Sequence, residues 1–267
     1  MSLHFMPSYV KQRFANTLSP WNYDVRKDHV IYTVEPNMVL KIFNINSVNG
    51  SAAFPEPLRL AISDVAYRRQ NKEAISRSDV ELELEGERLI TQYHANVAQY
   101  LRVNGVASPL PLAVLRPSQT AELFNPLKMT MRRIGRQLVG QAPESFRHSL
   151  LEEKLPMKPL STLTSKEVSQ YILDIDYIRR LGFEPADTSL MHGKNVQYIK
   201  AQGHDDGLVA FFDFQYWRPI TDETRALMHQ PIDSSNPLFS YPRFADEAQD
   251  RTKKINAVLS TYADDKN

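Results

Sequence analysis

The alternation of apolar and polar residues predicts strands at two places where a turn separates two apolar runs. In the stretch 29–43, "HVIYTVEPNMVLKIF", Pro36 and Asn37 are strong turn formers between the two runs. We therefore expect a β-hairpin there. A second hairpin is predicted further along, where "NVQYIK" would pair with "LVAFFDF" across "AQGHDDG". Between these hairpins, "LPLAVLRP" and "LKMTMRRI" are two further strand candidates.

Helical spacing of apolar residues predicts helices in much of the remaining chain. A long helical region over about 59–101 is expected to break near 76–79, where Ser78 or Asp79 would cap its second part. The chain is expected to turn helical again after "GRQLVGQAP", and a last helix is predicted over about 243–262.

The clearest helix is predicted in "TSKEVSQYILDIDYIRRLG". Thr164 and Glu167 have the spacing of a capping box, and Gly182 stands where a terminating glycine belongs. One side of this helix is expected to be apolar, and it consists of Val168, Tyr171, Ile172, Ile175 and Ile178.

The order of these elements predicts an α+β protein in two lobes. The predicted division is a flexible N-terminal segment over 1–20, a sheet with a long helix over 21–135, and helices with the second hairpin over 136–267. Hydrophobic residues make up 42% and charged residues 24% of the chain, which is typical of a soluble globular protein.

The charge balance and the absence of cysteine exclude several classes of function. With 32 basic and 31 acidic residues the net charge is +1, so no global field attracts the chain to nucleic acid or to a membrane. No apolar run is long enough to span a membrane, and the first 20 residues lack the apolar core of a secretory signal. Zero cysteines exclude disulfides, thiolate metal sites and cysteine nucleophiles.

Two charged residues interrupt apolar strands, and each raises the question of its partner. In "GLVAFFDFQY" a run of five apolar residues ends at Asp213, whose carboxylate is costly to bury unless a metal or a basic side chain meets it. Lys41 interrupts "MVLKIF" and would need an anion if it faced inward. The alternative for both residues is an outward position at a strand end or edge.

The order of the charged residues resembles that of protein kinases. In "EGERLITQYHANVAQYL", Glu85 precedes His94 by nine residues, the spacing that kinases show between the regulatory-helix glutamate and the histidine of the "HPNIV" turn. The alternative is a solvated acidic helix face, because Glu81, Glu83 and Glu87 stand nearby. After the capped helix, "RRLGFEPADTSLMHGKNVQYIK" resembles a catalytic loop with Asp187 and Asn195, and Asp213 in "FFDF" takes the place of the metal-binding aspartate. The resemblance covers about 29–217.

This resemblance implies a two-lobed kinase-like fold that uses ATP and Mg²⁺. Lys41 and Met131 are the implied nucleotide contacts. Glu85 would orient Lys41, and Asp187 would position the hydroxyl that accepts the phosphoryl group. Asn195 and Asp213 are implied as ligands of Mg²⁺.

The chain is also similar to compact kinase effectors that bacteria secrete. That similarity implies a soluble protein, either cytoplasmic or exported into a host cell without a classical signal peptide. Its partner would be a host or cellular protein, with no role for nucleic acid and no membrane span.

The chain departs from the kinase pattern at several positions. "DVRKDHVIYTVEPN", which precedes Lys41, contains no glycine, and Pro185 replaces the usual catalytic-loop histidine. The step from Asp187 to Asn195 is eight residues instead of five, and Gln215 replaces the glycine after Asp-Phe. A non-catalytic pseudokinase that docks a partner therefore remains an alternative, as does an interaction protein of unrelated α+β fold.

Other sites have weaker support. A metal hydrolase would draw on His192, His204, Asp205, Asp206 and Asp213, but acids and glycine are common in hairpin turns for backbone reasons. No phosphate-binding loop and no Gly-x-Ser-x-Gly elbow occurs. The cluster of Arg132, Arg133 and Arg136 is interpreted as a solvated rim, with contact to phosphate or to an acidic partner as the alternative.

Overall fold

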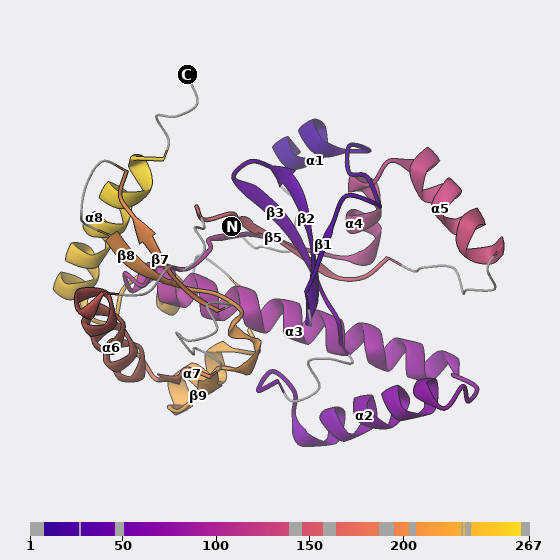
Figure 1. The fold of residues 1–267 in the computed structure, drawn as a ribbon. Coiled ribbons are helices and arrows are strands. Elements are labelled where there is room, and N and C mark those ends of the chain that lie inside the picture. Colours follow the sequence, from indigo (N-terminus) through magenta and orange to yellow (C-terminus); the bar gives the residue numbers. More distant parts are fainter. Residues whose placement is uncertain are drawn as a thin grey trace.

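The chain folds into an α+β structure built around a five-stranded antiparallel sheet (Figure 1). The computed structural model describes residues 8–26, 28–45, 51–138, 146–156, 164–186, 195–202, 207–230, 232 and 236–262. The sheet has the strand order β1-β2-β3-β5-β4. Its strands are β1 (Asp24–Val25), β2 (His29–Glu35), β3 (Met38–Phe43), β4 (Pro111–Leu115) and β5 (Ser149–Glu153). The predicted hairpin over 29–43 and the predicted strand "LPLAVLRP" are confirmed.

The two faces of this sheet lie against different hydrophobic clusters. Successive side chains of a strand point to opposite faces, so Leu40 and Lys41 lie on opposite sides. Leu40 belongs to a cluster with Tyr32 and Phe14, next to the helices α1 (Ser8–Phe14) and α4 (Pro117–Leu123). The Lys41 face belongs to the larger cluster, which includes Phe43 and Leu150 and extends to the helix α3 (Arg77–Val103).

Helix α3 runs beneath the sheet and connects it with the second half of the chain (Figure 1). The predicted break near 76–79 is confirmed, but the cap is Ser76, whose hydroxyl accepts from the backbone N–H of Asp79. The carboxylate of Asp79 in turn accepts from the backbone N–H of Ser76, which completes a capping box. The middle of the helix, around His94, is completely buried.

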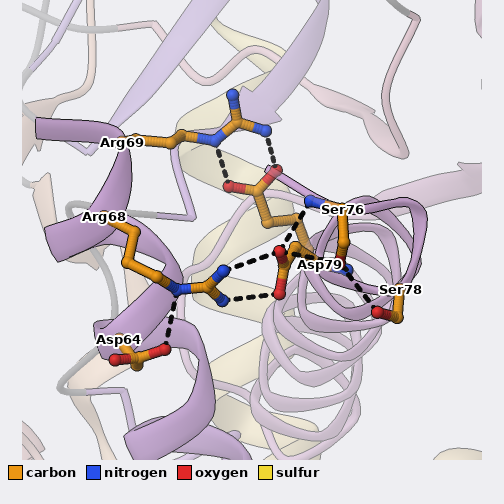
Figure 2. Close-up of polar contacts among 7 residues, drawn as sticks. Asp64, Arg68, Arg69, Ser76, Ser78 and Asp79 are labelled. Carbon is orange, nitrogen blue, oxygen red and sulfur yellow. Dashed lines mark hydrogen bonds and ion pairs between the residues drawn. The ribbon is translucent and has the colours of Figure 1, made fainter. Parts of the chain in front are cut away.

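Helix α2 (Glu56–Gln70) is fastened to the start of α3 by two arginines (Figure 2). Arg68 makes a bidentate pair with Asp79 at 2.6 and 2.9 Å, and Arg69 makes one with Glu83 at 2.6 and 2.7 Å. Bidentate pairing fixes the direction of both side chains. These ion pairs add to an apolar contact, because Ile62 of α2 is buried in the same hydrophobic cluster as Ile90 of α3.

A second hairpin and four helices build the rest of the described chain. Strands β7 (Val196–Lys200) and β8 (Gly207–Phe211) form the predicted hairpin, and β6 (Phe183–Glu184) pairs with β9 (Arg218–Pro219). The helices are α5 (Pro126–Leu138), α6 (Ser165–Arg180), α7 (Asp222–Leu227) and α8 (Ala245–Ser260), with short 3-10 turns at Phe214–Tyr216 and Pro237–Phe239. Phe211 and Phe214 contact the ring of Trp217 edge-on, and all three rings are buried.

Helix α6 confirms the predicted caps but not the whole predicted apolar side. Thr164 and Glu167 form the capping box, and Gly182 follows the helix with a φ of 97°. Val168 and Ile172 are exposed, whereas Tyr177 is buried. The buried side instead includes Asp174, which can face inward because its carboxylate meets Arg251 at 2.6 Å.

Two local predictions are wrong. "LKMTMRRI" lies in helix α5, where the spacing of Leu127, Met131, Ile134 and Leu138 is that of one helix side. The stretch expected to turn helical after "GRQLVGQAP" contains β5, which lies between β3 and β4. Its strand conformation depends on these two neighbours, which lie far away in the sequence.

Part of the segment predicted as a flexible N-terminus carries structure. Residues 8–20 include α1, and the backbone N–H of Leu18 donates to the carbonyl of Leu123 at 2.9 Å. Phe14 and Leu18 are both buried. Within the described residues, no helix combines the length and the hydrophobicity needed to cross a membrane.

Candidate functional site

The candidate site is a buried cluster of charge centred on Lys41. Strand β3 places this side chain in the middle of the sheet, on the face toward α3, with 4% of it exposed. The ammonium lies 2.9 Å from Oδ1 of Asp213 and 3.0 Å from Oε1 of Glu152. One lysine therefore joins a carboxylate of β5 to a carboxylate that follows β8.

Asp213 reaches Lys41 through an unusual backbone conformation. Its φ of 58° and ψ of 61° are left-handed, a region that few residues other than glycine adopt and that aspartate tolerates better than most. Phe212, just before it, donates its backbone N–H to the carbonyl of Asn195 at 2.8 Å, and a 3-10 turn starts just after it at Phe214. The apolar run before Asp213 thus builds a buried strand end that directs one carboxylate toward the lysine.

Two histidines complete the cluster. Nε2 of His29 lies 3.9 Å from Oδ1 of Asp213, and Nε2 of His94 lies 3.5 Å from Oε2 of Glu152. Burial lowers the pKa of His29 to about 4, although the charge of Asp213 opposes this change. Burial also lowers the pKa of His94 below its ordinary value. Both imidazoles are therefore neutral at pH 7.

The lysine and the two acids keep each other ionised. Burial alone would lower the pKa of Lys41, but the carboxylates of Asp213 and Glu152 raise it above its ordinary value. Burial likewise opposes ionisation of Asp213, yet Lys41 lowers the pKa of that carboxyl to about 2. The pKa of Glu152 is lowered, against its burial, by Lys41 and then by His94. At neutral pH these five side chains hold one cation and two anions.

Several buried polar atoms of the cluster have no hydrogen-bond partner among the described residues. Oε2 of Glu152, Nδ1 of His29 and both ring nitrogens of His94 are buried without a hydrogen-bond partner there, since 3.5 Å is too long for a strong bond between His94 and Glu152. Buried polar groups without partners are rare and often mark a site that takes water or a ligand. The excess negative charge favours a cation.

The structure places Glu85 away from Lys41. Its carboxylate is exposed and makes a bidentate pair with Arg88 at 2.6 and 2.7 Å. Within the described residues, the ion-pair partners of Lys41 are Glu152 and Asp213. Glu152 was not predicted from the sequence because β5 was expected to be helical. The available signal was an acid directly after the apolar pair in "SLLEE".

Asn195 is connected through its backbone to the residue that precedes Asp213. It directly precedes β7, it is buried, and its carbonyl accepts the hydrogen bond from Phe212. Asn195 therefore lies at the same end of the β7–β8 hairpin as Asp213. Asp187 falls outside the described residues, and so do His192, His204, Asp205 and Asp206.

Met131 is not part of this cluster. It lies on α5, where its side chain is exposed, and not on a strand beside Lys41. Between α5 and the sheet is a cavity of about 240 Å³, lined among others by Val30, Tyr32 and Ile42. These side chains lie on the sheet face opposite to Lys41, so the cavity is separate from the charged cluster.

Comparisons with known proteins do not assign the chain to a family. No family model matches it, and no curated protein or solved structure does. In the part of the chain that the structure describes, no group of three or more histidine, aspartate and glutamate side chains has a geometry that could hold a metal ion. Any metal at Asp213 would therefore need other oxygen ligands, such as the amide of Asn195.

Proposed function

We propose that the chain is an ATP- and Mg²⁺-dependent phosphotransferase with a two-lobed, protein-kinase-like organisation, acting on protein hydroxyls. The contact between Lys41 and Asp213 carries this proposal. The kinase resemblance requires that a cation from an early strand, Lys41, and an acid from a late strand, Asp213, lie next to each other. Lys41 and Asp213 meet at hydrogen-bond distance, and the backbone carbonyl of Asn195 accepts from Phe212, the residue before Asp213.

The donor set at the hairpin end fits Mg²⁺. Asp213 and Asn195 offer carboxylate and amide oxygens, which are ligands that this hard cation prefers. The side chain of Asp213 is 16% exposed, against 4% for Lys41, so the acid forms the more accessible part of the cluster. When bound, the ion would be held by Asp213 and Asn195 and would supply positive charge that neutralises the phosphate groups of ATP.

The remaining residues have roles that follow from their positions. Lys41 would contact the phosphates, and Glu152 would hold its ammonium in place, a role that the kinase resemblance assigned to Glu85. The neutral His29 would add no charge at the cluster near pH 7. Asp187 stays the candidate for positioning the acceptor hydroxyl. A role as a secreted bacterial effector that modifies a host protein belongs to this proposal on the resemblance alone.

The burial of Lys41 favours a second candidate, a pseudokinase that binds a partner without transferring phosphate. Both carboxylates lie within 3.0 Å of the ammonium. A phosphate group would therefore have to replace one of them. A partner-binding protein that keeps this ion cluster as a structural element would need no such exchange.

A phosphotransfer assay separates these candidates. The full chain is incubated with Mg²⁺ and ATP labelled at the terminal phosphate, with itself and a generic protein as acceptors. The wild type is expected to transfer label, Asp213→Asn to lose the transfer, and Glu85→Gln to keep it. Absence of transfer with retained Mg²⁺-dependent ATP binding would support the pseudokinase, and absence of both would refute a kinase-like function.

A further inference from the structure

Helix α5 displays a continuous apolar stripe on its outer side. The stripe consists of Leu127, Met131, Ile134 and Leu138, whose exposed fractions are 76%, 65%, 51% and 81%. Their spacing repeats the helical period, so the four side chains line one side of a helix about 20 Å long. Exposed apolar patches of this kind usually mark an interaction site.

The opposite side of α5 attaches the helix to the rest of the protein. Met129 packs against the cluster of Tyr32 and Leu40, and the guanidinium of Arg132 lies 5.4 Å from the ring centre of Tyr23 and donates to the carbonyl of Pro20. Each residue turns a helix by about 100°, which puts Met129 across the axis from the stripe and Arg132 about 130° from the stripe centre, on the side of Lys128. The stripe therefore points away from the protein, and Figure 1 shows α5 at the edge of the fold.

The charge of α5 differs from that of the whole chain. The helix carries Lys128, Arg132, Arg133 and Arg136 and no acidic residue, although the chain has a net charge of only +1. Lys128 and Arg133 are exposed and lie on different sides of the stripe, about 90° and about 130° around the helix from its centre, from where their long side chains can reach a surface that the stripe enters. An apolar stripe between cations is typical of helices that lie in the interface of an anionic bilayer.

We propose that α5 docks the protein on an anionic lipid surface. The stripe enters the boundary between headgroups and acyl chains, and Lys128 and Arg133 contact anionic headgroups on both sides of it. A planar anionic surface meets the cations on both flanks at once, whereas a protein groove would need acidic residues along both of its walls. This docking is peripheral, and it does not depend on the proposed phosphotransfer.

The absence of cysteine allows a direct test in the full chain. Ile134→Cys is labelled with a polarity-sensitive dye, and Ile172→Cys on α6 is the matched control, because the two isoleucines are 51% and 53% exposed. Vesicles of phosphatidylcholine with about one third phosphatidylserine should shift the emission at residue 134 to the blue and leave residue 172 unchanged. Vesicles of phosphatidylcholine alone should shift neither.

Substitutions then test separately the apolar contribution of the stripe and the electrostatic contribution of the cations beside it. Leu127→Ser with Met131→Ser should lower partitioning into the anionic vesicles by about tenfold or more, and Lys128→Glu with Arg133→Glu should do the same and remove its salt dependence. The control pair, Leu60→Ser with Leu173→Ser, changes apolar side chains of similar exposure on α2 and α6 and should leave partitioning unchanged. Circular dichroism confirms that each variant is folded.

Several results would overturn the proposal. They are no partitioning of the wild type into anionic vesicles, an equal shift at residues 134 and 172, or equal loss in the stripe variant and its control. Sedimentation that shows self-association abolished by Leu127→Ser and Met131→Ser would assign the stripe to a second copy of the chain instead. Binding to an acidic protein without any binding to vesicles would assign it to a protein partner.

Discussion

Lys41 and Asp213 are separated by 172 positions in the sequence, yet their side chains form a hydrogen-bonded ion pair of 2.9 Å. The pair joins the main sheet to the turn after β8. The cost of burying these charges is offset only because they meet each other and Glu152. Removing one charge of such a cluster is therefore expected to cost more than the intact cluster contributes.

Lys41→Met should destabilise the protein strongly. The substitution keeps the length of the side chain and leaves Asp213 and Glu152 buried without their cation. Loss of one partner of a buried pair costs about 3–5 kcal/mol. Urea unfolding followed by circular dichroism measures the change, and a loss below about 1 kcal/mol would mean that the two acids do not depend on this lysine.

Glu152→Gln and Glu85→Gln should have different effects. Glu152 is buried against Lys41, so its neutralisation should cost about 2 kcal/mol or more. Glu85 forms an exposed pair with Arg88, and such pairs contribute about 0.5 kcal/mol or less. Equal unfolding midpoints for the two variants would contradict the placement of Glu152 beside Lys41.

His29 should make the fold sensitive to acid. Its pKa is lowered by burial from 6.5 to about 4, so between these pH values the unfolded chain binds a proton that the folded chain does not. The contribution of His29 to the free energy of unfolding is complete above pH 6.5. It is lost as the pH falls toward 4, and the loss amounts to about 3 kcal/mol at most. His29→Gln should flatten the stability profile in that window, as measured by thermal unfolding against pH.

Asp213 loses its contribution in a lower window of pH. Its pKa falls from 3.8 to about 2, so its contribution is present above pH 3.8 and disappears toward pH 2. Because the two pH ranges do not overlap, the loss of stability from His29 can be measured separately from the loss from Asp213. If the stability of wild type and of His29→Gln changed in the same way between pH 6.5 and 4, His29 would not be buried in its neutral form.

Replacement of Gly182 and of Gly135 by alanine should change the stability of the protein in opposite directions. Gly182→Ala should destabilise by about 1 kcal/mol or more, because the φ of 97° is unfavourable for alanine and the new Cβ would lie 2.8 Å from Cγ2 of Thr224. Gly135 lies inside α5 with no atom within 4 Å of a new Cβ, so Gly135→Ala should stabilise by about 0.5–1 kcal/mol. Differential scanning calorimetry measures both. Destabilisation by Gly135→Ala would contradict the open surroundings of that residue in α5, and stabilisation by Gly182→Ala would contradict its left-handed conformation.

Local patterns predicted the elements whose signals lie within a few neighbouring residues. The hairpin around Pro36 and the caps at Thr164 and Gly182 are of this kind, since turn and cap residues act on the backbone next to them. Strand β5 was missed because its conformation comes from pairing with β3 and β4. Glu152 was missed with it.

The meeting of Lys41 and Asp213 was predicted from the order of charged residues along the chain, together with the apolar residues next to each of them. The apolar residues around each of them required a buried partner of opposite charge. Glu85 could not be distinguished by sequence from the other acids of the same helix, and the structure pairs it with Arg88. The position of Met131 followed from the wrong secondary structure for α5.

Binding of ATP, measured by isothermal titration calorimetry with and without Mg²⁺, tests most directly whether the Lys41–Asp213 cluster is a nucleotide site. We predict binding by the wild type that requires Mg²⁺ and an affinity at least about tenfold lower in Asp213→Asn and in Asn195→Ala, with Glu85→Gln unchanged. Thermal unfolding confirms that the variants are folded at the temperature of the titration. No binding by the wild type, or equal affinity of wild type and Asp213→Asn, would contradict the account.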